Sequence, residues 1–224
     1  MDDLTTRPAQ ARGIEPRWPV ALAVIGVSFL LGQLPDRVRT FPVWVPYILG
    51  FALVVPMAAI ALTRAKEQWL RVERMTTLLF FVVGGSGMVA NLAQLIAEMV
   101  RGSGQVDGIQ LLTSSVAIWV NNVLTFSLLY WQIDRGGPEA RATHASTRPD
   151  WLFPQDGARD FVPPDWRPTF IDYLFLGYST GTAFSAADTL PLTSRAKILM
   201  MLESAISLVT IVAVMSRAIG ILGS

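Results

Sequence analysis

Long apolar runs are the feature of this sequence that most limits its fold. The last run, residues 195–222, would form a helix about 40 Å long, since an α-helix rises about 1.5 Å per residue. This helix is long enough to cross the hydrocarbon core of a bilayer, which is about 30 Å thick. Four earlier runs cover residues 18–34, 43–63, 75–100 and 110–133. The chain is 52% hydrophobic and 16% charged, which is typical of an integral membrane protein. The pattern therefore predicts an all-α, polytopic transmembrane protein.

Composition divides the chain into four parts. Residues 1–16 form a polar tail, and residues 17–133 contain the first four predicted spans. Residues 134–167 are rich in Gly, Pro and mixed charge, which predicts a polar linker. Residues 168–224 contain a short polar-aromatic segment followed by the last span. No small-x-small cleavage pattern follows the first run, so we expect a retained span rather than a signal peptide.

The segment before the last predicted span mixes aromatic and polar residues. Thr169 and Asp172 have the spacing of a capping box, which predicts a short helix over residues 171–180. The stretch TAFSAAD follows at residues 182–188, and Pro191 marks a turn before the last helix. At the end of this stretch, the carboxylate of Asp188 is expected either to accept amides of that turn or to lie at a pore mouth.

This order of short helix, Thr-rich stretch, Asp, Pro, Thr and apolar helix resembles the pore region of tetrameric potassium channels. The resemblance implies a filter-like strand formed by Thr182, Ala183, Phe184, Ser185, Ala186, Ala187 and Asp188. Ser185 and Ala187 stand where potassium filters have glycine, which reaches the backbone angles of a filter at little cost. The implied filter is therefore non-standard. The segment is also similar to uncharacterised bacterial inner-membrane proteins with a TxF-S-x-x-D pattern before their last helix, which implies a multi-pass protein of that membrane.

Polar residues recur on one face of three predicted spans. They are Asn91, Gln94 and Glu98 in the third span, Asn121 and Thr125 in the fourth, and Glu203 and Arg217 in the last. One interpretation is a hydrated path or a buried binding site, because ionisable groups at membrane depth are costly and commonly mark ion or proton routes. The other is helix packing, since polar side chains also join membrane helices by hydrogen bonds. The stripes of the third and fourth spans are candidates to face each other.

The distribution of Arg and Lys predicts the topology. The amino terminus, the loop around residues 64–74 and the linker are the most basic segments, so the positive-inside rule places them in the cytoplasm. Two arrangements remain open. Either five helices span the membrane and residues 170–187 form a re-entrant segment, or this segment crosses as a sixth span. In the second arrangement both termini are cytoplasmic, and Arg195 and Lys197 lie opposite the linker.

Several function classes lack their usual residues. The chain has no cysteine and one histidine, His144 in the linker, so neither a metal site nor a catalytic triad is predicted. Phosphate-loop and dinucleotide patterns are missing, as are basic patches with interleaved aromatics, so we expect no enzyme, no cofactor and no nucleic-acid partner. The expected partners are the lipid bilayer and further copies of the chain, four if it forms a pore. Two functions stay open: a channel-like protein conducting a small ion along residues 182–188, or a non-conducting membrane scaffold.

Overall fold

The computed structural model describes residues 15–63, 67–101, 108–143, 148–158, 160–163, 166–183 and 188–222. Six helices form a bundle: α1 (Trp18–Gly32), α2 (Trp44–Thr63), α3 (Glu67–Arg101), α4 (Gly108–Ile133), α7 (Phe170–Ala183) and α8 (Ser194–Leu222). Short elements fill the linker: η1 (Asp134–Gly136), α5 (Pro138–Thr143), β1 (Trp151–Leu152) and α6 (Pro154–Gly157). The strand β2 (Leu190–Pro191) precedes α8 and pairs antiparallel with β1. The prediction of a mainly helical protein is confirmed.

Three helical stretches in the described part of the chain are long and apolar enough to cross a membrane. They are Arg71–Val100 in α3, Ile109–Gly136 in α4 with η1, and Ser194–Ser216 in α8. Two shorter apolar stretches, Trp18–Gly32 in α1 and Trp44–Ala59 in α2, correspond to the first two predicted spans. The chain thus has the composition of a membrane protein along its longest helices.

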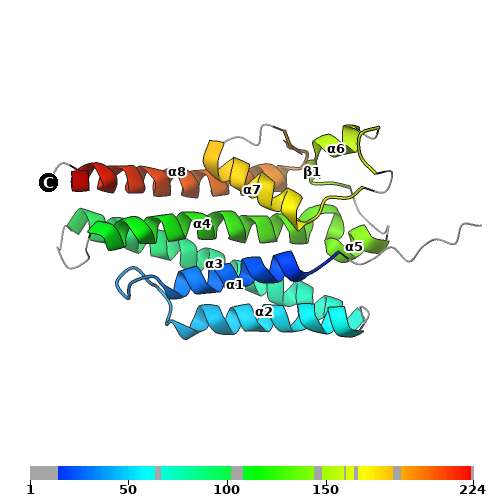
Figure 1. Ribbon diagram of the computed structural model, residues 1–224, viewed down its shortest axis with the longest axis horizontal. Coiled ribbons are helices and arrows are strands. Elements are labelled where there is room, and N and C mark those ends of the chain that lie inside the picture. The colour runs from blue at the N-terminus through cyan, green and yellow to red at the C-terminus, as the bar shows by residue number, and fades with distance from the viewer. Residues whose placement is uncertain are drawn as a thin grey trace, which may run out of the picture.

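Helix α4 lies at the centre of the bundle, where it contacts α1, α3, α7 and α8 (Figure 1). At one end of the bundle, α1, α3, α7 and α8 begin and α2 and α4 end, next to α5, α6 and β1. We call this the linker end. The opposite end carries the start of α2, the end of α3, the start of α4 and the carboxyl end of α8. Segments far apart in the sequence therefore meet at the linker end.

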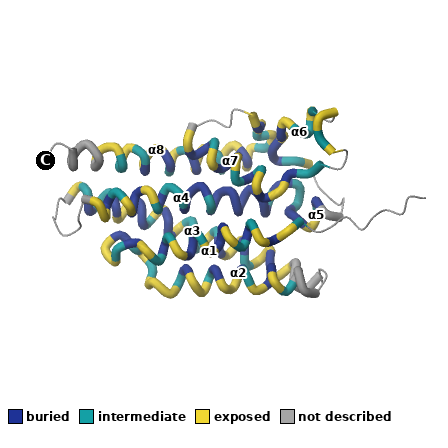
Figure 2. The backbone as a smooth tube through the Cα atoms, in the orientation of Figure 1, coloured by how far each residue is buried: buried dark blue, intermediate teal, exposed yellow. Residues whose placement is uncertain are grey.

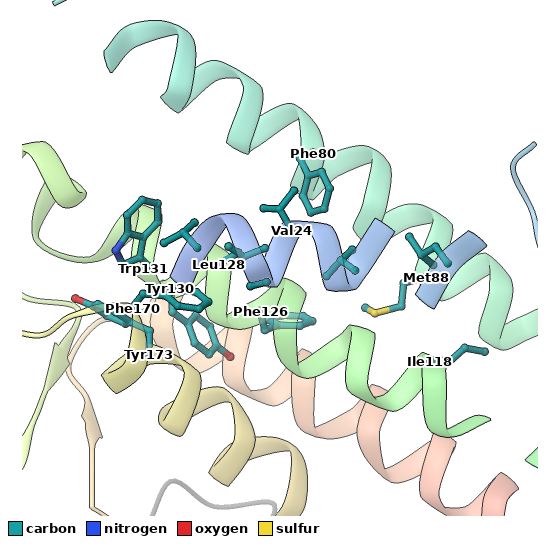
Figure 3. Packing of buried hydrophobic residues seen from close by; sticks show 14 of the residues in the cluster. Val24, Phe80, Met88, Ile118, Phe126, Leu128, Tyr130, Trp131, Phe170 and Tyr173 are labelled. Carbon is teal, nitrogen blue, oxygen red and sulfur yellow. The ribbon is translucent and has the colours of Figure 1, made fainter. Parts of the chain in front are cut away.

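The core is apolar and surrounds α4. Figure 3 shows Phe126, Leu128, Tyr130 and Trp131 of α4 among buried side chains from the neighbouring helices. Figure 2 shows that burial runs along α4, whereas the outer side of α2 is exposed. Large apolar side chains also point outward on α2, α3 and α8, for example Phe51, Val82 and Met215. An apolar outer surface of this extent is expected where lipid or other protein covers it.

Helix α7 does not cross the bundle. It begins at the linker end, where Phe170 packs edge-on against Trp131 near the end of α4. Its last turns lie beside the middle of α4, because Trp119 Nε1 donates to the Gly181 carbonyl at 3.2 Å. By Leu190 the chain is back at the linker end, where β2 pairs with β1. At 14 residues, α7 is about 21 Å long, too short for a bilayer core.

The start of α8 lies against the linker, because the β1–β2 ladder and an ion pair between Asp150 and Arg195 hold it there. Residues 170 and 190 therefore belong to the same end of the bundle.

Candidate functional site

A buried group of polar side chains lies where α4, α7 and α8 meet. It consists of Asn122, Ser127 and Tyr130 from α4, and Glu203 and Ser207 from α8. We call these five residues the polar cluster. Each is completely buried, with an exposed fraction of 0%. Glu203 is the tenth residue of α8, so its backbone lies about 14 Å along the helix from Ser194, well inside a bilayer-sized bundle.

Glu203 is held by one side-chain hydrogen bond. The Tyr130 hydroxyl donates to its Oε2 at 2.6 Å. The other carboxyl oxygen, Oε1, is buried without a hydrogen-bond partner in the described part of the chain, and no ion pair to Glu203 occurs there. An isolated ionised carboxylate is very costly in such surroundings. A buried carboxyl group of this kind is therefore the strongest candidate for a functional residue in the protein.

Asn122 and Ser207 bind α4 to α8 beside the carboxyl group. Asn122 Nδ2 donates to the Ser207 hydroxyl at 2.8 Å and to the Glu203 backbone carbonyl at 3.1 Å. Ser127 donates to the Val123 carbonyl within α4 at 2.7 Å. The two Asn122 bonds hold α4 against α8 beside Glu203, so the position of Glu203 does not depend on its carboxyl group alone.

Two glycines let α7 lie directly over the polar cluster. Gly177 and Gly181 are four residues apart and share the face of α7 that meets α4 and α8, a spacing typical of close helix contacts in membranes. A Cβ atom at Gly177 would lie 2.4 Å from Ser127 Oγ and 3.2 Å from Glu203 Oε1. At Gly181 it would lie 3.1 Å from Ser207 Oγ. Side chains at these positions would push α7 away from Glu203.

The start of α7 is fixed by carboxylates. As predicted, Asp172 accepts the Thr169 backbone N–H, at 2.7 Å, but the Thr169 hydroxyl donates to the same carboxylate instead of accepting an amide. Glu15 accepts the Phe170 backbone N–H at 2.6 Å and Trp131 Nε1 at 2.9 Å. The chain before α1 is thereby joined to the start of α7.

Two buried aspartates anchor the linker end. Asp134, at the end of α4, accepts the Tyr173 hydroxyl at 2.6 Å and the Asp150 backbone N–H at 2.7 Å. Tyr173 lies outside the three candidate spans, and burial raises the pKa of its phenol well above the usual value, so the hydroxyl remains a donor. The Asp150 carboxylate accepts Arg195 Nε and the Thr193 hydroxyl, each at 2.6 Å. Together these bonds position α7 and α8 against α4.

The polar residues predicted on α3 and α4 have different surroundings. Asn91 accepts the Thr40 backbone N–H at 2.7 Å, which joins α3 to the α1–α2 connection instead of to α4. Glu98 is buried, whereas Gln94 is exposed. Asn121 and Thr125 are buried, and their side-chain oxygens have no partner among the described residues. Of the predicted intramembrane residues, only Glu203 belongs to the polar cluster.

The filter-like stretch is only partly described. Thr182 and Ala183 belong to the last turn of α7, and the exposed Thr182 hydroxyl donates to the Tyr178 carbonyl at 2.6 Å. These two residues are therefore helical, which corrects the expectation of an extended strand from residue 182. Asp188 is exposed. Phe184, Ser185, Ala186 and Ala187 lie outside the described residues, as does the side chain of Arg217.

Comparisons with protein-family models, curated proteins and solved structures gave no match for this chain. Its function must therefore be inferred from its own residues.

Proposed function

We propose that the chain is a multi-pass membrane protein that conducts a small cation through a pore formed at α7 and α8. The observation that supports this most is the course of α7, which enters the bundle from the linker end and ends beside the middle of α4. Broken or re-entrant helices at membrane depth occur where protein or a water-filled cavity surrounds them. The carboxyl end of a helix carries a partial negative charge of about −0.5, which favours a cation beside it.

The proposed topology has five spans, with the linker end in the cytoplasm. Of the 13 Lys and Arg residues in the described part of the chain, four belong to segments at the opposite end: Arg37, Arg39, Arg101 and Arg217. The other nine, including Arg195 and Lys197, belong to segments at the linker end. This asymmetry agrees with the positive-inside rule. The amino and carboxyl termini then lie on opposite sides of what we take to be a bacterial inner membrane.

In this orientation α7 enters from the cytoplasm. The pore helix of a potassium channel enters from outside, so the resemblance extends to the order of the elements but not to their orientation. The proposed conduction path runs beside Thr182 and Asp188, which are exposed, and past the end of α7.

An axial pore requires several copies of the chain. The face of α7 that carries Phe175, Tyr178 and Thr182 is exposed, and so are Met201 and Leu208 on α8. Tyr178 and Thr182 place hydroxyl groups on an otherwise apolar surface. Polar groups at membrane depth are better covered by protein or water than by lipid. We therefore propose that α7 and α8 line the axis of a homo-oligomer, with four copies as the expected number.

The test is flux through purified protein in liposomes, together with the oligomeric state in detergent. We expect a tetramer, cation flux and weak discrimination between potassium and sodium, because glycine is missing from the filter-like stretch. A monomer or dimer without flux would contradict conduction. It would favour a non-conducting scaffold as the second candidate. The bonds that join Asn91 to the α1–α2 connection and Asn122 to α8 support this alternative.

A further inference from the structure

We infer that Glu203 forms an intramembrane proton-binding site with Tyr130 and Ser127. The site is separate from the proposed conduction path, because Gly177 and Gly181 face the polar cluster while Tyr178 and Thr182 lie on the exposed side of α7. A proton can occupy this site whether or not the protein conducts.

Few charged groups surround the Glu203 carboxyl group. From α4, Tyr130 is the titratable residue that contacts Glu203. The face of α7 over the cluster presents Gly177, and its buried phenol, Tyr173, bonds to Asp134 instead. On α3, which also packs against α8, Glu73 pairs with Arg17. In the described part of the chain, therefore, no cation neutralises Glu203.

A proton or a metal ion could neutralise the Glu203 carboxylate. Divalent ions such as Ca²⁺ require six to eight oxygen ligands, commonly with several carboxylates. Among the residues that the structure describes, no group of three or more acidic, histidine or cysteine side chains is placed to hold a metal. The polar donors Tyr130 and Asn122 also direct hydrogen atoms, not lone pairs, toward their partners here. A proton needs no additional ligand, because binding to Oε1 removes the charge.

The two carboxyl oxygens of Glu203 differ in which of them can carry the proton. Tyr130 already donates to Oε2, so a proton on the carboxyl group belongs on Oε1. Three oxygens surround the point where a side chain on Gly177 would begin: Ser127 Oγ at 2.4 Å, and Glu203 Oε1 and the Val123 carbonyl at 3.2 Å each. Oε1 is not hydrogen-bonded to either oxygen in this structure, but Ser127 Oγ and the Val123 carbonyl lie around the same point under α7 as Oε1 does. The protonated form therefore keeps the Tyr130 bond on Oε2 and has oxygen acceptors on the side of its own hydroxyl.

Infrared difference spectroscopy of the full-length protein tests this inference directly. The spectrum of the wild type minus that of Glu203→Gln should contain the C=O band of a carboxylic acid at neutral pH. The band should be lost at high pH and should be the same in sodium and in potassium buffers. Its absence at neutral pH would show that Glu203 is ionised and would overturn the inference. Its loss on adding sodium at constant pH would overturn it in favour of a cation site.

A second variant separates proton binding from simple packing. In Tyr130→Phe the carboxyl group loses the donor on Oε2, so the C=O band should move to higher frequency without disappearing. Tyr178→Phe is the matched control, because Tyr178 is exposed and its ring packs edge-on against Trp119. An unmoved band in Tyr130→Phe would contradict the assigned hydrogen bond. None of these infrared measurements depends on ion flux. The conduction proposal can therefore fail while the proton-binding inference holds, and the reverse.

Discussion

Tyr173 on α7 donates to Asp134 at the end of α4 over 2.6 Å, although 39 positions separate the two residues in the sequence. Both side chains are completely buried. The bond therefore fixes the start of α7 relative to α4, the central helix of the bundle.

Replacing Tyr173 with Phe should destabilise the protein by about 1–3 kcal/mol, because a buried carboxylate oxygen then loses its donor. The measurement is the midpoint of thermal unfolding in detergent. Tyr178→Phe, on the exposed face of the same helix, should leave the midpoint nearly unchanged. Equal effects of the two substitutions would show that the bond to Asp134 contributes nothing specific.

Adding a methyl group at Gly177 should separate α7 from α4. The new Cβ would lie 2.4 Å from Ser127 Oγ, and overpacking of this kind typically costs about 1–3 kcal/mol. Gly157→Ala is the control, since no atom lies within 4 Å of its added Cβ. Combining Gly177→Ala with Ser127→Ala removes the closest atom and should recover part of the loss. No recovery in the double variant would place the obstruction elsewhere.

The proposed five-span topology predicts opposite results for two reporter fusions. A periplasm-active reporter inserted within residues 136–147 should be silent, whereas the same reporter after the carboxyl terminus should be active. The reason is that the chain after α7 is back at the linker end, at β2, before α8 begins. Reporter activity within the linker would show that the proposed orientation is reversed. Equal reporter activity at both positions would favour an even number of spans, as in the six-span alternative.

Asp188 should matter through its charge. It is exposed at the return of the re-entrant segment, so Asp188→Asn should lower cation flux while the unfolding midpoint stays close to wild type. If Asp188 instead stabilises the turn before α8, Asp188→Asn will be mild and Asp188→Ala will cost about 1 kcal/mol through a lost hydrogen bond. Unchanged flux and stability in both variants would exclude Asp188 from the site.

Hydropathy and capping patterns were sufficient to predict the long helices and α7, and they placed Glu203 among the candidate intramembrane polar residues. Each of these signals is local, because it depends on residues within a few turns of one another. The partners of Glu203 were not predicted. Asn121 and Asn122 are adjacent on α4 but differ in direction by about 100°, so the sequence alone does not tell which one meets α8. The structure shows that Asn122 does.

The anchoring of the linker end was also missed. Asp134 and Asp150 lie in a stretch rich in Gly and Pro, where mixed charge usually means solvated loop. Their burial depends on partners from α7 and α8, at sequence separations of 39 and 45 residues. Periodicity carries no information about such pairs.

Phe161 is exposed and lies between β1 and α7, so a cut at this position would divide the chain into two fragments. Strand β1 would belong to the first fragment and its partner β2 to the second. The same division separates α4 from α7 and α8, whose contacts are among the most extensive in the bundle. A break in the backbone near Phe161 would therefore leave two complementary fragments with a ready-made interface. The two fragments are therefore expected to reassemble when they are produced together.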